Sequence, residues 1–179
     1  EVGAQIINDK VLKEINRGHG VDAIIKATQE LKDAGFKVLY HMMLNLPGSD
    51  YKKDLESFKE IFTNPLFKPD MIKIYPCLVT KDTKLEKMYY TKEYTHYGLE
   101  KTVKLIADIK EMVPPWVRIM RIQRDIPADK IIAGIKKSNL RQLVEEELKK
   151  RGKHCNCIRC SEPKGVLKDI KGYVVDVKE

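Results

Sequence analysis

The feature that most restricts the fold of this chain is an alternation between short apolar runs and longer segments of helical periodicity. Apolar residues dominate 37–44 (KVLYHMML) and 70–76 (DMIKIYP), and a weaker run covers 1–7. Segments 21–34 and 50–62 separate these runs and have the spacing and caps of helices. Strands that alternate with helices are typical of a parallel α/β sheet. We therefore predict an α/β fold, a partial parallel (β/α) barrel with strands at the three runs.

Capping and helix-breaking residues divide the remainder of the chain. Asp9 is the predicted N-cap of a first short helix, Gly35 closes the helix at 21–34, and Ser49 or Asp50 caps the helix at 50–62. Beyond the third strand, the pattern predicts a helix at 96–113, an extended segment with a basic side at 116–122, and helices at 127–137 and 140–151.

Polar side chains stand at the ends of the three predicted strands. Gln5 ends the first, His41 and Asn45 lie near the end of the second, and Tyr75 and Cys77 lie at the end of the third. Ligands of parallel α/β sheets bind at the carboxyl ends of the strands, so these residues are candidates for a binding site. The competing interpretation is structural, because a histidine within a strand is more often a satisfied core residue than a ligand.

Three of the four cysteines, Cys155, Cys157 and Cys160, fall within six residues. Thiolates bind zinc tetrahedrally, and a structural zinc site needs four ligands, so we predict zinc at this loop with Cys77 as the fourth ligand. His154 is the local alternative, although neighbouring ligands at 154 and 155 are sterically awkward. A set of unpaired thiols without a metal is a further alternative, whereas an iron–sulfur centre fits the C-x-C spacing poorly. No secretory signal opens the sequence, so we expect reduced thiols and a cytoplasmic location.

The net charge of +8 is concentrated in one part of the chain. Residues 1–113 carry 18 basic and 17 acidic side chains, whereas residues 114–153 carry 11 basic and 5 acidic ones. A local excess of this kind is typical of a surface that meets a polyanion such as RNA. The candidates are Arg118, Arg121, Arg124, Lys136, Lys137, Lys149, Lys150 and Arg151. One alternative is an ordinary solvated, lysine-rich surface. Another is that Arg118, Arg121 and Arg124 form ion pairs with the acidic run Glu145–Glu147.

No apolar run approaches the roughly 18 residues that a membrane-spanning helix needs, so we expect no membrane partner. The first residue is Glu1 and a predicted strand begins almost at once, which suggests a fragment of a longer protein.

Several short motifs together resemble one family, the catalytic subunit of Elongator in its archaeal or bacterial single-chain form. The similarity covers roughly residues 1–165, and the combination of a PPW motif with RIQRDIP is specific to it. The motifs are EVGAQ at 1–5, GH at 18–19, GFKV at 35–38, YHM at 40–42, LPGSD at 46–50, IKIYP at 72–76, VPPW at 113–116, RIQRDIP at 121–127 and NLR at 139–141.

The resemblance implies a tRNA-modifying enzyme that uses acetyl-CoA to install a carboxymethyl-type group at carbon 5 of the wobble uridine. S-adenosylmethionine and a four-iron four-sulfur cluster would generate a radical in such proteins. Gln5 matches the segment that contacts S-adenosylmethionine in the family, and His41, Asn45 and Tyr75 would face the same cavity. The family's cluster-binding cysteine motif and its acetyl-CoA-binding domain are not found in these 179 residues, so no residue of this chain is assigned to catalysis.

The resemblance also suggests how the chain is divided. Its expected parts are the second half of a radical-SAM partial barrel (1–113), a basic extended and helical segment (114–152), a zinc-binding loop (153–163), and a linker toward an acetyltransferase domain (164–179). Two rival hypotheses remain, a zinc-stapled RNA-binding module without catalysis and a radical-SAM enzyme that acts on a small molecule. A homodimer is open in either case.

Overall fold

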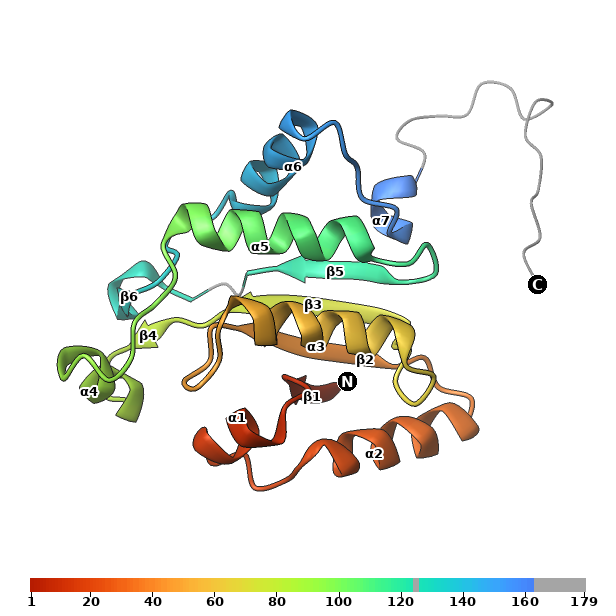
Figure 1. Ribbon diagram of the computed structural model, residues 1–179, viewed down its shortest axis with the longest axis horizontal. Helices are drawn as coiled ribbons and strands as arrows, with labels where there is room; N and C mark the ends of the chain where they lie inside the picture. Colours follow the sequence, from red (N-terminus) through yellow and green to blue (C-terminus); the bar gives the residue numbers. More distant parts are fainter. Residues whose placement is uncertain (124–125, 163–179) are drawn as a thin grey trace.

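The computed structural model describes residues 1–123 and 126–162, and its centre is a four-stranded parallel sheet (Figure 1). The strands are β1 (Val2–Gln5), β2 (Leu39–Leu44), β3 (Met71–Pro76) and β5 (Arg118–Ile122), in the order β1-β2-β3-β5. β2 and β3 pair in register from Leu39 opposite Met71 to Leu44 opposite Pro76. The predicted parallel α/β arrangement is therefore confirmed. Whether the sheet is part of a barrel stays a prediction.

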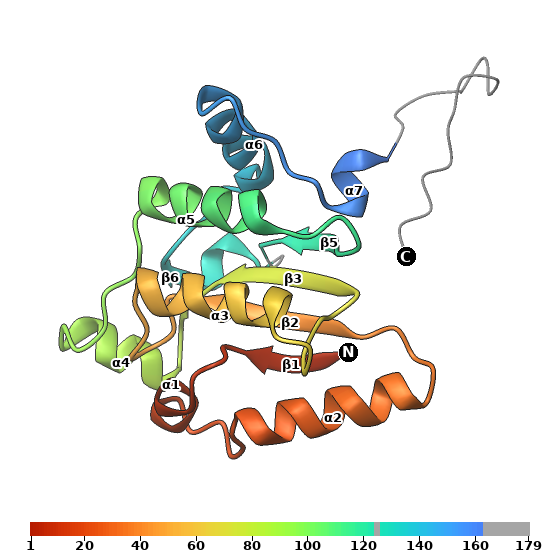
Figure 2. The same ribbon diagram turned by 45° about the vertical axis from the view of Figure 1, so that its right-hand side comes forward.

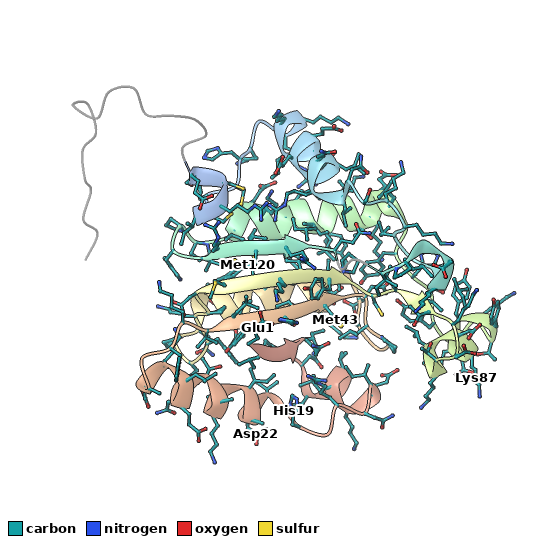
Figure 3. All side chains as sticks on the ribbon, turned by 180° about the vertical axis from the view of Figure 1, so that it is seen from behind. Glu1, His19, Asp22, Met43, Lys87 and Met120 are labelled. Atoms are coloured by element: carbon teal, nitrogen blue, oxygen red, sulfur yellow. The ribbon has the colours of Figure 1, made fainter. Side chains whose placement is uncertain are left out.

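Helices connect successive strands and gather on one face of the sheet. They are α1 (Asp9–Glu14) and α2 (Val21–Asp33) between β1 and β2, α3 (Tyr51–Thr63) between β2 and β3, and α5 (Leu99–Met112) before β5. Figure 3, which views the molecule from behind, shows the strands nearest the viewer with the helices beyond them. One face of the sheet is therefore packed against helices, and the other face is open.

Buried and half-buried residues alternate along the strands, because one face of the sheet is covered by helices and the other is open. On β2, Tyr40, Met42 and Leu44 are fully buried, whereas His41 and Met43 between them are only half-buried. Successive side chains on a strand point to opposite faces, so the half-buried residues belong to the open face. Figure 3 shows Met43 of β2 on this face together with Glu1 and with Met120 of β5.

The segment 116–122, expected to be extended with a basic side, contains the fourth strand of the sheet. This strand, β5, is hydrogen-bonded to β3 with Ile72 opposite Ile119. Val117 and Ile119 are fully buried, because the strand needs an apolar side toward α5 as well as a basic one. The sheet therefore continues past the boundary expected after residue 113.

The prediction of a helix at 127–137 is wrong. Ala128–Lys130 forms a single 3₁₀ turn, and Ile131–Ala133 forms a short strand, β6, antiparallel to β4 (Val79–Thr80). Gly134 has a φ of +111° and lies close to Leu78, the residue before β4. A Cβ added to Gly134 would be 2.8 Å from a Leu78 methyl carbon. A glycine in this conformation ends the segment where a helix would have continued.

The remaining helices are α4 (Lys84–Tyr90), α6 (Leu140–Lys150) and the short α7 (Ile158–Ser161). α6 matches the predicted helix and packs on α5 through Leu140, Val144 and Leu148, all of which are buried. Asp50 caps α3 as predicted, accepting a bond of 2.9 Å from the Lys53 N–H.

Two predicted helix starts are displaced. Asn8, not Asp9, accepts the capping bond of α1, from the Val11 N–H at 3.2 Å. The Asp9 carboxylate instead accepts a bond from the first N–H of α2, at Val21. α5 starts at Leu99 after Gly98, so residue 96 lies in the preceding loop and not in the expected helix. For α1, the contact of Asp9 with Val21 explains why the neighbouring Asn8 is the cap.

Within the described part of the chain, no helix combines the length and apolar character needed to cross a bilayer.

Candidate functional site

A cavity of about 410 Å³ lies on the open face, toward the carboxyl ends of the strands. Three of the four residues expected to face a cofactor, namely Gln5, His41 and Tyr75, line it. The His41 and Tyr75 rings meet edge to face, with centroids 5.6 Å apart. The rest of the lining comes from Met43, Pro76, Leu78, Thr80 and Ile126. The cavity thus combines apolar walls with a few polar groups, as small-molecule sites do.

Gln5 stands in a strained backbone conformation at the edge of this cavity. Its φ is +64°, which is unfavourable for a residue with a side chain, and the Ile6 N–H donates to the Ala4 carbonyl at 2.8 Å across it. A left-handed non-glycine residue costs on the order of 1–3 kcal/mol and persists only where the surrounding structure imposes it. The turn redirects the chain at the end of β1 and leaves the Gln5 side chain on the cavity wall.

Two charged residues that sequence reasoning did not select lie beside His41. His41 Nε2 is 2.8 Å from one Glu1 carboxylate oxygen, and the Lys73 ammonium donates to the other at 2.8 Å. Lys73, and then His41, lower the pKa of the Glu1 carboxyl by hydrogen bonding. Lys73 could have been found from the alternation in IKIYP, since it lies two residues before Tyr75 and on the same face.

Asn45 corrects the fourth cofactor prediction, because it does not line the cavity. Its side chain is buried on the other side, where Oδ1 accepts the Tyr97 N–H at 2.5 Å and the Tyr94 hydroxyl at 3.2 Å. Its Nδ2 donates to the Thr95 carbonyl at 3.3 Å. A φ of +59° turns the chain at the end of β2 and directs the amide toward the loop before α5. Asn45 therefore holds a loop in place.

Asp54, on α3, is a buried carboxyl beneath the same turn. It accepts the Asn45 N–H at 2.8 Å and the Ser49 hydroxyl at 2.5 Å. Burial is the largest influence on this group and raises its pKa from 3.8 to about 6, although both hydrogen bonds act in the opposite direction.

We expect Asp54 to make the folded state less stable as the pH rises. A carboxyl whose pKa is raised in the folded state favours folding below its unfolded value near 3.8, and that contribution is lost as the pH passes about 6. The loss is at most about 3 kcal/mol, at 1.36 kcal/mol per pKa unit. Denaturant unfolding between pH 4 and 7 should show a flatter pH dependence in Asp54→Asn.

Asp50→Asn is the matched control, since hydrogen bonds from the N–H and ammonium of Lys53 lower the pKa of Asp50 and give it the opposite sign. Identical pH profiles for Asp54→Asn and the unmodified protein would contradict the prediction.

The cysteine loop forms the second candidate site, and the structure brings three thiols together. The Sγ atoms of Cys155, Cys157 and Cys160 all lie within 4.8 Å of one another. The loop is fastened to the edge of the sheet because the Ile158 N–H donates to the Val117 carbonyl at 3.0 Å and Arg159 donates to the Met120 carbonyl at 2.9 Å. Figures 1 and 2 both show α7 beside the start of β5.

The environment of the three thiols favours ionisation of one of them. A hydrogen bond from the Cys155 thiol, the largest influence, lowers the pKa of Cys157 below its ordinary value of 9.0, and the N–H groups of Ile119 and Cys160 act in the same direction. Thiolates, not thiols, bind metals. The cluster is thus arranged as a soft-donor metal site with three sulfur ligands.

Cys77 corrects the prediction of the fourth ligand. It follows β3 at the carboxyl end of the sheet, where its N–H donates to the Leu44 carbonyl at 2.9 Å and its thiol lies by the Tyr94 hydroxyl. It is not among the metal-ligating groups gathered around the triad. Burial raises the pKa of Cys77 to about 11, so it is held as a neutral thiol. The error arose because the sequence shows that a cysteine is spare but not at which end of the sheet it lies.

A cavity of about 420 Å³ opens beside the triad between α5, α6 and the cysteine loop. Cys155 and Cys160 line it together with His154, Lys110 and Glu145. His154 is exposed and, among the described residues, is not within ligand distance of all three sulfurs. The open side of the triad therefore faces this cavity.

The predicted RNA-binding residues have different environments. Arg118 forms an ion pair with Glu162. Arg151 bonds three carboxylates, Asp108 at 2.6 Å, Glu147 at 2.9 Å and Glu111 at 3.0 Å, which makes it a link between α5 and α6. The alternative interpretation, ion pairing of the arginines in 116–127 with the acidic run 145–147, is wrong for Arg118, whose partner is Glu162.

The other candidates are more accessible. Lys136, Lys137, Lys149 and Lys150 are exposed. Arg121 is exposed too, and it lies opposite Lys73 in the β3–β5 pairing, next to the open face. Arg124 lies outside the described residues. The structure thus leaves the lysines and Arg121 at the surface and assigns Arg151 to an internal contact.

Comparison with known proteins finds relatives that are similar over most of this chain. The family model of the radical-SAM C-terminal domain matches residues 69–150. A protein named tRNA uridine(34) acetyltransferase from Methanocaldococcus jannaschii is 50% identical over 177 residues, covering 96% of this chain and 33% of the relative. The Homo sapiens protein named Elongator complex protein 3 is 40% identical over 162 residues, covering 90% of this chain and 30% of the relative.

A solved structure also matches. The Elp3 of Methanocaldococcus infernus, lacking residues 1–46 of its own N-terminus, superposes with a TM-score of 0.85 at 52% identity, over 88% of this chain and 37% of that one. The chain thus spans about a third of the length of its relatives.

Proposed function

We propose that this chain belongs to the family of tRNA uridine(34) acetyltransferases and Elongator complex protein 3, of which it spans about a third, and that it is part of a radical-SAM enzyme that modifies the wobble uridine of tRNA. The modification would be a carboxymethyl-type group at carbon 5, derived from acetyl-CoA. Acetyl-CoA and the four-iron four-sulfur cluster are assigned to the parts of the relatives that this chain does not span.

The observation that carries the proposal is the cavity at the carboxyl ends of the parallel strands. Its walls combine the strained Gln5, the paired rings of His41 and Tyr75, and apolar groups such as Met43. A site for S-adenosylmethionine needs an apolar surface for the adenine and a few polar groups that orient the sulfonium and amino-acid parts. Bound there, S-adenosylmethionine would supply a radical together with the cluster. Gln5, His41 and Tyr75 would bind and orient it.

The lysine–glutamate pair beside His41 supports the same assignment. Glu1 and Lys73 both contact Nε2 of His41, and the Tyr75 ring meets the His41 ring edge to face. A side chain held by several partners loses little further freedom when a ligand binds, which favours a preorganised site.

We assign zinc to the cysteine loop. Zinc–sulfur bonds of about 2.3 Å in a tetrahedron place sulfurs roughly 3.8 Å apart, and the three Sγ atoms already lie within 4.8 Å of one another. Cys155, Cys157 and Cys160 would be three of the four ligands. His154 or a water molecule on the cavity side would be the fourth. The site would fasten the end of the described chain to β5 and α5.

The tRNA-facing surface is assigned to residues 114–153. Arg121, Lys136 and Lys137 are exposed, as are Lys149 and Lys150 at the carboxyl end of α6. Arg124 keeps its assignment on sequence grounds alone. Arg118 can contribute only if it leaves Glu162.

The proposal is tested by the modification of tRNA by the full-length protein. Under anaerobic reducing conditions with tRNA, acetyl-CoA and S-adenosylmethionine, mass spectrometry of digested tRNA should detect a carboxymethyl-type uridine at position 34. Tyr75→Ala and Gln5→Ala should each lower product formation tenfold or more, because both side chains line the cofactor cavity. Their tRNA affinity should stay within about twofold of the unmodified protein. Lys26→Ala, on the outer surface of α2, is the control and should keep full activity.

A zinc-stapled RNA-binding module is the second candidate, favoured by the thiol triad and the basic surface. It predicts tRNA binding without any modified uridine in the same assay. A small-molecule radical-SAM enzyme would bind S-adenosylmethionine but not tRNA. The homodimer and the cytoplasmic location stay predictions.

A further inference from the structure

We infer that Lys110 is the counter-charge of the three-thiolate metal centre, a positioning residue that neutralises the site without binding the metal. The inference rests on the metal site proposed above and is independent of the tRNA-modifying activity.

The observation behind it is a lysine in a place where lysines are rarely found. Lys110, on α5, has an exposed fraction of 0%, and its Nζ has no hydrogen-bond partner among the described residues. The nearest carboxylate oxygen, from Glu145, is 3.8 Å away, and its side chain is 45% exposed. A buried ammonium without a compensating charge is strongly unfavourable, so the fold must supply an anionic partner.

The partner is identified by what else faces the same space. Lys110 lines the cavity beside the triad together with Cys155 and Cys160. Lys149 and Lys153 also line this cavity but are exposed to solvent. Glu145, Cys155 and Cys160 are therefore the acidic groups that border the cavity with Lys110 among the described residues. The Glu145 carboxylate is 3.8 Å from the Lys110 ammonium and partly exposed to solvent. The cysteine sulfurs are therefore the main partner of Lys110.

The charges of the three thiolates, a zinc ion and Lys110 add up to zero. Three thiolates and one Zn²⁺ carry a net charge of −1, and a neutral fourth ligand such as His154 or water leaves that charge unchanged. The Lys110 ammonium brings the total to zero inside a largely buried environment. A fourth thiolate would have left one negative charge uncompensated, so the separate position of Cys77 agrees with a single buried lysine.

The inference is tested by zinc affinity in the full chain, measured by competition with a chromophoric chelator. Lys110→Met should bind zinc tenfold to 100-fold more weakly, the range typical for groups that support metal ligands. Lys110→Arg should stay within about threefold, because it keeps the charge. Lys104→Met, an exposed change on the same helix, and Glu145→Gln should also stay within threefold.

Thermal unfolding with and without zinc provides a second readout, which a purely structural role would not change. The zinc-induced increase in Tm should shrink in Lys110→Met, while the zinc-free form is as stable as the unmodified protein or more so. If Lys110→Met does not fold, Lys110→Gln takes its place as the neutral variant.

Several outcomes would overturn the inference. Unchanged zinc affinity in the neutral variant would do so. Equal losses in Lys110→Arg and Lys110→Met would show that the lysine is a ligand or a packing element, and a loss of the same size in Glu145→Gln would show that Lys110 serves that carboxylate. If the unmodified protein takes up no zinc, the metal assignment itself fails and is thereby distinguished from a failure of the lysine's role.

Discussion

Cys157→Ser is expected to lose stoichiometric zinc, whereas Cys77→Ser keeps it. Cys157 is fully buried between the other two thiols and accepts the hydrogen bonds that favour its thiolate, so its loss removes the central ligand of the site. Elemental analysis of protein purified without added metal should give about one equivalent of zinc in the unmodified protein. It should give less than half an equivalent in Cys157→Ser.

Cys77→Ser is the matched control for this experiment because it removes a buried thiol from the opposite end of the sheet. Zinc lost in both variants would mean that Cys77 completes the site after a rearrangement of the chain. Full zinc in Cys157→Ser would leave the triad as unpaired thiols.

Cys157→Ser should also loosen the end of the described chain. α7 is held to β5 by few direct bonds, including those from Ile158 and Arg159, and it has only four residues. A bound metal stabilises the folded state by an amount that grows with its concentration relative to Kd. Limited proteolysis should therefore cut near residue 157 faster in the variant, and adding zinc should protect only the unmodified protein.

Removing the basic groups of the proposed tRNA surface is expected to reduce both tRNA affinity and its dependence on salt. Lysine and arginine that contact phosphates release counterions, so each contact contributes about 0.7–0.9 to the slope of log affinity against log salt. The combined change Arg121→Ala, Lys136→Ala and Lys137→Ala should lower affinity at least tenfold near physiological salt. The slope should fall by roughly 2 to 3 if all three contact phosphates.

Two controls make the tRNA measurement specific. Lys26→Ala with Lys52→Ala removes two exposed charges from α2 and α3, and it should change affinity by less than threefold. Arg118→Ala, Arg121→Ala and Arg124→Ala together test the original arginine assignment. If neither triple variant within 114–153 changes the tRNA affinity or its salt slope, the RNA surface lies outside residues 114–153.

The distinction between a surface residue and an internal contact could not be made from charge alone. Arg151 and Lys150 are neighbours with the same sign of charge, yet Arg151 bonds three carboxylates and Lys150 is exposed. Adjacent helix residues point about 100° apart, so one can face a neighbouring helix while the other faces solvent. Only the packing of α6 on α5 decides which of them does so.

The parallel sheet and the thiol triad could be predicted from the amino-acid sequence, because both follow from local patterns. Buried strands such as 37–44 show their burial in their composition, and three cysteines within six residues cannot lie far apart. The cavity residues Gln5, His41 and Tyr75 were also predictable, since the carboxyl ends of parallel strands share one edge.

The contacts between strands, loops and helices that are distant in the chain became visible only in the folded structure. Folding placed β5 beside β3, turned Asn45 away from the cavity, and put Cys77 at the other end of the sheet from the triad. It also buried Lys110, which looks like any surface lysine in the helix DIKEM. The physical reason is that burial and electrostatic partners arise from contacts between residues distant in the chain, and local spacing contains no record of them.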